Sequence, residues 1–322
     1  PVSVELSPAP ESMPQFRVVA DAAGRATAEA LRDELGLPLS SRVRGATDFS
    51  ARLLFPDNQV EEPSPFTIEL ASDLRDMEIA VPRPLGKTAG QRVDVAASIY
   101  MPKGSDRVET SGSAGDIFTW QVVMTKQEGA WDIDRGIAIF GDGDQETPDT
   151  RGLHLVGSTD YIHVRRWFEM GRSTDKKLGM VNWIRSVDLE VANLHLLGQH
   201  LIDHRIRVDR SARDWHIDVE GDDIVATTSI PYDFNSGRPV VVEAERLVLP
   251  GNDSESDSEP TRIDPRVLPP ISIVSKETAF GPRYFGAVEA NFLRTADGLE
   301  SETIIAKDPT FEIVGNAAWI LD

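Results

Sequence analysis

Two groups of residues in this sequence have side chains and spacings that could do chemistry, and the first is a run of acids. Asp142, Asp144 and Glu146 alternate within a Gly-Asp-Gly-Asp-Gln-Glu segment, as the carboxylates of a calcium-binding loop do. Such a loop needs glycine at its sixth position, where this chain has Thr147, and an acid at its twelfth, where it has Leu153. These departures favour a solvated turn over a cation site.

The second group contains histidines and paired aspartates. His200 and His204 would share one face of a helix and could bind a metal there, with His195 close in sequence. A turn between two strands is the better interpretation, and it predicts a structural or surface role for the three side chains. Asp132 and Asp134 would face the same side of a strand, but a chain with 53 acidic residues is expected to contain such pairs by chance.

Other signatures of catalysis and cofactor binding are absent from the sequence. It has no Gly-x-Ser-x-Gly elbow, no phosphate-binding loop and no Gly-x-Gly-x-x-Gly fingerprint. It also has no cysteine, which excludes disulfides, thiolate metal sites and cysteine nucleophiles. We therefore expect a protein that is not an enzyme and that holds neither a metal nor a cofactor.

The charge of the chain limits its partners. The net charge is −20, which argues against nucleic acid, because phosphates need Lys and Arg to displace their counterions. The same charge argues against lying flat on an anionic membrane surface. No apolar run approaches the roughly 18 residues that a membrane-spanning helix needs.

Hydrophobicity that alternates with a period of two predicts that most of the chain forms β-strands. Apolar and polar residues alternate in Phe66–Ala71, Arg205–Asp209 and Trp215–Glu220, which places the apolar side chains of each strand on one face. Turns rich in Gly, Pro, Asn and Asp separate the segments. The predicted strands are Phe16–Ala20, Thr47–Phe55, Phe66–Ala71, Met77–Val81, Arg92–Tyr100, Phe118–Lys126, Gly136–Phe140, Gly152–Gly157, Val187–Leu196, His204–Arg210, Trp215–Glu220, Ile224–Ile230, Val240–Leu249, Ile271–Ser275, Ala287–Arg294, Glu300–Ala306 and Phe311–Ile320.

Only two helices are predicted. The first spans Thr27–Leu35, where alanines and leucines form one apolar stripe before a glycine. The second spans Tyr161–Met170, with its N-cap among residues 158–160. Trp167 and Phe168 are expected to form the buried face of this second helix.

Three features concern the organisation of the chain. The polar and acidic stretch Gly251–Pro265 is expected to be a flexible, solvated loop. The chain opens at Pro1 without a methionine or the basic segment of a signal peptide, and it ends in a strand-like Trp319–Asp322 segment. We therefore expect residues 1–322 to be one section of a longer protein.

Three runs in the chain carry distinctive loop and turn residues. They are Gly24–Leu39 with Val43–Phe49, then Leu74–Gly90, and last Asp264–Ile273 with Phe280–Gly281 and Thr295–Leu299. Together and in this order they resemble the AsmA-like proteins of Gram-negative bacteria, in the YhdP branch. The runs are spread over most of the chain, so they indicate a family without marking a site.

The resemblance implies a periplasmic body anchored to the inner membrane by an N-terminal helix that is absent from this chain. Such a body is a bridge-like lipid transport protein, proposed to carry phospholipid between the inner and outer membranes. We therefore expect an all-β, mainly antiparallel fold, in which an elongated, curled and repetitive β-sheet forms a hydrophobic groove, with two short helices. The expected partners are phospholipid acyl chains and, through parts outside this chain, both membranes. Nucleic acid is not expected, and the protein partners are unknown.

The alternating strands supply the candidates for the groove lining. They are Phe66, Ile68, Leu70, Ile137, Ile139, Val187, Leu189, Val191, Ile206, Val208, Trp215, Ile217, Val219, Ile271 and Ile273. Each could instead be an ordinary core residue of a closed β-sandwich, in which case the protein would be a structural spacer or assembly protein of the envelope. A third hypothesis is an enzyme acting on envelope glycans, which would need two acids roughly 5 to 9.5 Å apart in a cleft.

Overall fold

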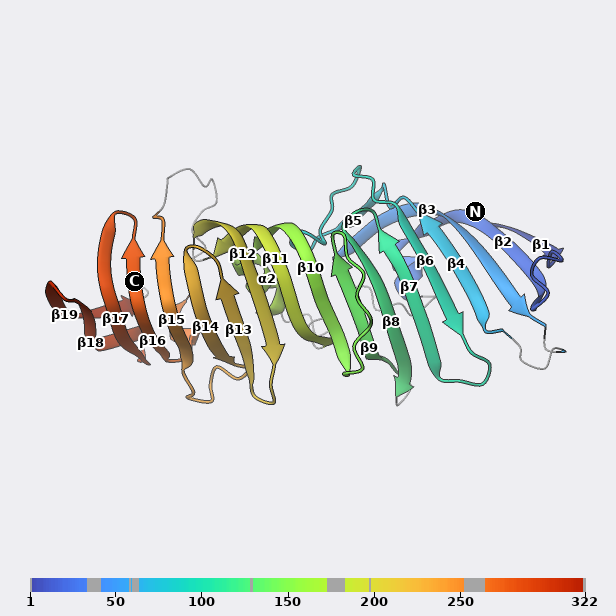
Figure 1. Cartoon of the computed structure of the whole chain (residues 1–322). Coiled ribbons are helices and arrows are strands. Elements are labelled where there is room, and N and C mark those ends of the chain that lie inside the picture. The colour runs from blue at the N-terminus through green and yellow to red at the C-terminus, as the bar shows by residue number, and fades with distance from the viewer. Residues whose placement is uncertain are drawn as a thin grey trace. The chain divides into compact units, whose positions relative to one another are not determined.

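The computed structural model describes residues 2–33, 42–57, 59, 64–127, 130–172, 183–196, 198–251 and 264–320. They form β-strands with two short α-helices and one 3₁₀ helix (Figure 1). The predicted all-β, mainly antiparallel fold is therefore confirmed. The chain divides into two compact units, residues 1–185 and residues 186–322.

The first unit is a sheet in which most strands pair with the next strand along the chain. Neighbours from β1 to β4, and from β6 to β9, are antiparallel, β4 pairs directly with β6, and β9 and β10 are parallel. The short β5 pairs with β3 instead. The elements are β1 (Val2–Pro8), β2 (Phe16–Thr27), α1 (Ala28–Asp33), β3 (Val43–Pro56), β4 (Phe66–Ser72), β5 (Met77–Ile79), β6 (Val95–Met101), β7 (Arg107–Ala114), β8 (Phe118–Gln127), β9 (Ala130–Phe140), β10 (Gly152–His163) and α2 (Val164–Arg172).

The second unit has the same meander pattern. Successive strands are antiparallel except β15 and β16, which are parallel. The elements are β11 (Ile184–Leu196), β12 (Gln199–Arg210), β13 (Asp214–Glu220), β14 (Ile224–Pro231), β15 (Val240–Leu249), η1 (Pro265–Val267), β16 (Ile271–Phe280), β17 (Arg283–Arg294), β18 (Gly298–Asp308) and β19 (Phe311–Ile320). Most of the acidic stretch 251–265 lies outside the described residues, and Pro265 begins η1.

Two of the observed strands, β7 and β1, are absent from the predicted set. β7 is rich in Ser, Thr, Gly and Glu, and its Gly112 is required by packing, since a Cβ there would lie 2.5 Å from Cζ2 of Trp120. β1 lies at the edge of its sheet, and its apolar residues Val2, Val4 and Leu6 are 57%, 62% and 69% exposed. β7 lacks an apolar pattern, whereas β1 alternates apolar and polar residues but leaves both kinds exposed.

The two helices are present but begin and end differently from the prediction. α1 follows Thr27, whose Oγ1 accepts a hydrogen bond from the Ala30 N–H at 3.1 Å, and the predicted end at Leu35 lies outside the described residues. The predicted N-cap of the second helix is wrong, because residues 158–163 continue β10 directly into α2. Trp167 is partly buried and its Nε1 donates to the Arg83 carbonyl at 3.1 Å; the side chain of Phe168 is outside the described set. No helix among the described residues has the length and apolar character that crossing a membrane requires.

Candidate functional site

The second unit carries a continuous apolar face, which the strand register defines. Directly paired residues of neighbouring strands point to the same face of a sheet. One such row crosses six strands through Val208, Ile217, Thr228, Val242, Ile273 and Ala290. The ten predicted groove residues of this unit all belong to this face: Val187, Leu189, Val191, Ile206, Val208, Trp215, Ile217, Val219, Ile271 and Ile273. We call it the apolar face of β11–β18.

One end of this face is closed by the tips of β11 and β12. The tips run past the turn between β13 and β14, and Asp203, with φ +53°, marks the position where β12 bends. The side chain of Gln199 then accepts a hydrogen bond from the Gly251 N–H at 2.8 Å, which links the start of β12 to the end of β15. Leu194 and Leu201 are fully buried at this closed end. Figure 1 shows the curvature of β11 and β12 at their upper ends.

The three histidines lie at this end and do not converge on a metal. His204 is 1% exposed and its Nδ1 bonds the Ile202 carbonyl at 2.9 Å. Its ring lies over Gly221, where a Cβ would come within 2.4 Å of His204 Cδ2. His195 and His200 stack with ring centroids 4.7 Å apart. Among the described residues no group of three metal-ligating side chains is found. His204 is packed in the interior, whereas His200 is exposed and lies 2.9 Å from Asn193 Oδ1 through its Nε2.

The opposite end of the apolar face is open. On β11 and β12, Val187 and Val208 are only partly buried, whereas Leu189, Val191 and Ile206, nearer the closed end, are buried. Trp215, Ile217, Val219, Ile271 and Ile273 are all partly buried. An ordinary sandwich core would bury such side chains on both ends of the strand. The described part of this unit therefore has an apolar surface that remains accessible along one edge.

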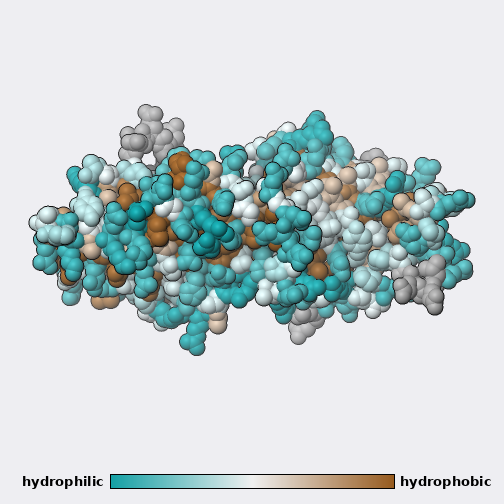
Figure 2. Space-filling model, viewed as in Figure 1, coloured by the Kyte–Doolittle hydropathy of each residue, from teal (hydrophilic) through white to brown (hydrophobic). Residues whose placement is uncertain are grey.

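The other face of the same strands is a charged ladder. Asp188 accepts two hydrogen bonds of 2.7 Å from Arg205, and Arg207 lies 3.3 Å from Glu220. The hydrogen bonds from Arg205 hold the pKa of Asp188 below its usual value. On the side of the molecule turned to the viewer in Figure 2, hydrophilic side chains predominate and hydrophobic ones show between them. The strands β11, β12 and β13 therefore separate apolar from charged side chains, as the alternation predicts.

The depressed pKa of Asp188 predicts a small, pH-dependent contribution to stability. The contribution is complete above the ordinary pKa of 3.8 and is lost as the pH falls below it toward the folded-state pKa. Asp188→Asn is therefore expected to lower the thermal midpoint more at about pH 6 than at about pH 3. The effect should be modest because the pair is partly exposed. A midpoint difference that is the same at both pH values would contradict this assignment.

The first unit has an apolar face of its own, and it contains three of the predicted groove residues. Ile68 is paired with Leu53 of β3 and Ile99 of β6, and Phe66 and Leu70 lie on the same side. Two hollows of about 950 Å³ and 800 Å³ adjoin these strands. Polar side chains line both, so neither is an enclosed apolar cavity.

Ile137 and Ile139 are not on that face. Ile137 of β9 is paired with Gln121 of β8. When this row of paired residues is traced across β7 and β6 to β4, it lies on the side of the sheet opposite Ile68. Both isoleucines are buried. The connection from β9 to the parallel β10 lies against them, with Gly143 close to the Ile139 side chain and Thr147 Oγ1 donating to Gln121 Oε1 at 3.1 Å. The acids of this connection are exposed, as expected for a solvated turn.

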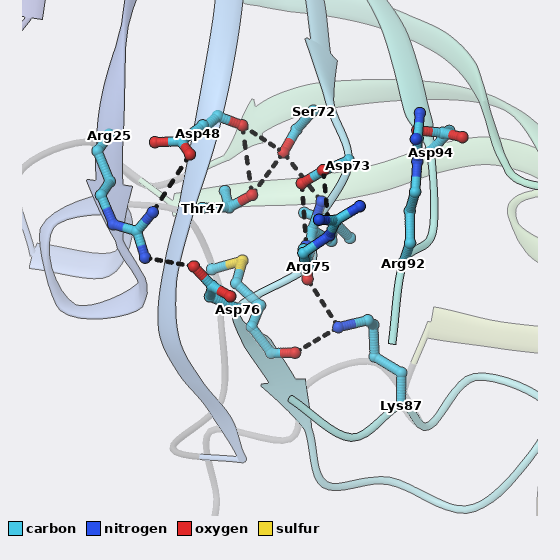
Figure 3. A network of polar contacts seen from close by, with 12 residues as sticks. Arg25, Thr47, Asp48, Ser72, Asp73, Arg75, Asp76, Lys87, Arg92 and Asp94 are labelled. Carbon is cyan, nitrogen blue, oxygen red and sulfur yellow. Dashed lines mark hydrogen bonds and ion pairs between the residues drawn. The ribbon is translucent and has the colours of Figure 1, made fainter. Parts of the chain in front are cut away.

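The first two family-like runs, far apart in sequence, meet in one polar network (Figure 3). Arg25 from the first run bonds Asp48 at 3.2 Å and Asp76 of the second run at 2.6 Å. Ser72, just before the second run, lies 2.7 Å from Thr47 through their hydroxyl oxygens. The network fixes the segment between β4 and β6 against β2 and β3.

Lys87 holds the same segment from within. Its side chain is 6% exposed, and Nζ donates to the carbonyls of Leu74 at 2.7 Å, Thr88 at 3.2 Å and also Met77. Burial lowers the pKa of Lys87, and the nearby carboxylates of Asp73 and Asp76 act in the opposite direction. Sequence reasoning missed Arg25, Asp48, Asp76 and Lys87 because it treated their runs only as family signatures.

The third run also forms a folded contact. Asp264 caps η1 by accepting the Arg266 N–H at 2.9 Å, and η1 packs against β18, where Leu299 is 1% exposed. Pro265 and Pro269 are fully buried. All three runs thus stabilise irregular segments around the sheets, and none of them contributes to the apolar face of β11–β18 except through Ile271 and Ile273.

Comparison with known proteins identifies a family for the chain. No curated protein and no solved structure matches the chain. The model of the YhdP protein family matches residues 1–322, which is the whole chain. The order of the three runs and the curled, mostly antiparallel sheets agree with that match, and the chain belongs to the YhdP protein family.

Proposed function

We propose that this chain is a non-enzymatic section of a conduit that carries phospholipid between the inner and outer membranes. The observation that supports it is the apolar face of β11–β18, which is continuous across the strands and accessible along one edge. Moving a lipid through water costs about 0.8 kcal/mol per methylene, or about 12 kcal/mol for one sixteen-carbon chain. An apolar surface that accepts the chain removes most of that cost, and the headgroup stays in water at the open edge.

Membership of the YhdP family supports the wider setting of this proposal. Residues 1–322 would be one section of a longer periplasmic body, with an inner-membrane helix and the contacts with both membranes outside this chain. Acyl chains are the proposed partners within it, and Phe66, Ile68 and Leu70 would contribute a second lipid-facing surface in the first unit. The chain would need no cofactor, because transfer along an apolar surface breaks no bond.

The proposal is tested by purifying the chain from bacterial cells without detergent and extracting it with organic solvent. Phospholipid should be recovered in at least an equimolar amount. Recovery of folded protein with no lipid would favour the alternative, a structural spacer or assembly protein with a closed β-sandwich core.

A further inference from the structure

Burial on the apolar face of β11–β18 increases along β11 and β12 from the open end to the closed end. Val187 and Val208, nearest the open end, are partly buried. Leu189 and Ile206 come next and are 4% and 8% exposed. An acyl chain that enters at the open end would therefore run along the strands toward a fully buried end.

Two directly paired sets of side chains form this buried end, which we call the floor of the apolar face. Val191 of β11 pairs with His204 of β12, and Leu194 pairs with Leu201. Each of the four side chains is 1% exposed or less. The apolar face therefore ends against protein rather than against water.

The backbone at Asp203 places Leu201 in the floor. Three positions separate Leu201 from His204, so a regular strand would direct their side chains to opposite sides. Asp203 has a left-handed backbone, with φ +53°, and it is exposed together with Ile202 between the two buried residues. The bend therefore shifts the alternation by one position, and the buried side of β12 continues past His204 to Leu201.

We propose that the floor limits the length of the acyl chains that the apolar face accepts, and that Leu194 and Leu201 set this limit. The inference rests on the proposed function, which it deepens from phospholipid in general to phospholipid of limited chain length. The headgroup stays in water at the open end, and the terminal methyl groups of the acyl chains meet the floor.

The depth of the face matches the reach of an acyl chain. A strand rises about 3.3 Å per residue, so Val208 lies about 13 Å from His204 and at most about 23 Å from Leu201 along β12. The hydrocarbon core of a bilayer is about 30 Å thick, so the chains of one leaflet reach about 15 Å. Chains of about sixteen to eighteen carbons, as in such a leaflet, would therefore reach the floor from the open end.

A fixed depth predicts a break in the dependence of lipid loading on chain length. A methylene that moves from a vesicle to the apolar face stays in an apolar environment, so chains shorter than the limit load about equally well. Each methylene beyond the limit is left in water, which reduces loading about fourfold. A face without a floor would show no break, because a longer chain could extend further along it.

The test loads the purified chain, stripped of lipid, from vesicles of a neutral carrier lipid. The vesicles contain equal amounts of phosphatidylglycerols that differ only in chain length, from twelve to twenty carbons, and mass spectrometry compares the bound lipid with the vesicles. For the wild type we expect constant loading up to about sixteen to eighteen carbons, then a fall of about fourfold or more per further carbon. Leu201→Ala shortens a floor side chain and should move the break to chains about two carbons longer.

Ile202→Ala is the matched control, because Ile202 is the next residue of β12 and its side chain is 50% exposed. It should leave the break unchanged, and the melting curve of each variant shows whether it is folded. Because Leu201→Ala removes volume from a fully buried site, Leu201→Val serves as a milder variant, with an expected shift of about one carbon.

The outcomes separate this inference from the proposed function. A wild type that loads every chain length without a break would overturn the limit while leaving the lipid conduit intact, and so would a folded Leu201 variant whose break does not move. A wild type that loads none of the lipids would overturn the proposed function and the limit together.

Discussion

Ile217→Asp is expected to reduce the phospholipid recovered with the purified chain to about a tenth of the wild-type amount or less. Ile217 lies in the middle of the apolar face of β11–β18, between Val208 and Thr228 of the neighbouring strands. A carboxylate at this position would have to be buried against acyl chains, at a cost of several kcal/mol. The measurement is the molar ratio of extracted phospholipid to protein.

The matched control for this variant is the next residue of the same strand. His216 is exposed and its Nδ1 lies 3.0 Å from Ser229 Oγ on the charged face. His216→Asp should therefore leave the lipid ratio unchanged, and Ile217→Leu should do the same because it keeps the surface apolar. If Ile217→Asp is folded by circular dichroism and retains its lipid, the apolar face does not hold the acyl chains.

Lys87→Met is expected to lower the free energy of opening the segment between β4 and β6 by about 2–4 kcal/mol. The substitution removes a buried donor from three carbonyls, those of Leu74, Met77 and Thr88. Amide exchange should accelerate by about thirtyfold or more at Met77 and Gly90, whose N–H groups bond carbonyls within this segment. Hydrogen–deuterium exchange resolved to short peptides measures the change.

Lys126→Met provides the comparison, because Lys126 is an exposed lysine on β8 of the same unit. Its effect on exchange in the 74–90 segment should be negligible, within about 0.5 kcal/mol. Equal exchange in the two variants would mean that the Lys87 contacts do not stabilise the segment.

Alternation in the sequence predicts β12 and β13 of the second unit well because their apolar residues lie on one side only. A period of two assigns each side chain to one side of its strand, even when the partner strand is unknown. The pairing register then brings the apolar sides of neighbouring strands onto the same face of the sheet. The same reasoning does not place Ile137 and Ile139 on one side of the sheet with Ile68. They lie on the opposite side from Ile68, where the connection from β9 to β10 covers them. When a strand has apolar residues on both sides, the sequence does not alternate and does not show which side faces the core.

The polar contacts could not be predicted for a different reason. Arg25 and Asp76 are 51 positions apart, and Gln199 and Gly251 are 52 apart. Local pattern contains no information on which distant loops meet, so the network in Figure 3 and the closed end of the apolar face follow from the fold alone.

The most direct test of the account is photo-crosslinking in cells at two adjacent residues of β13. A photoreactive amino acid replaces Ile217 in one version of the full chain and His216 in another, so that each version probes one face of the same strand. If the apolar face of β11–β18 holds acyl chains, the probe at Ile217 captures phospholipid and the probe at His216 does not. Capture of protein alone at Ile217, with no lipid at either position, would contradict it and identify the apolar face as a closed core.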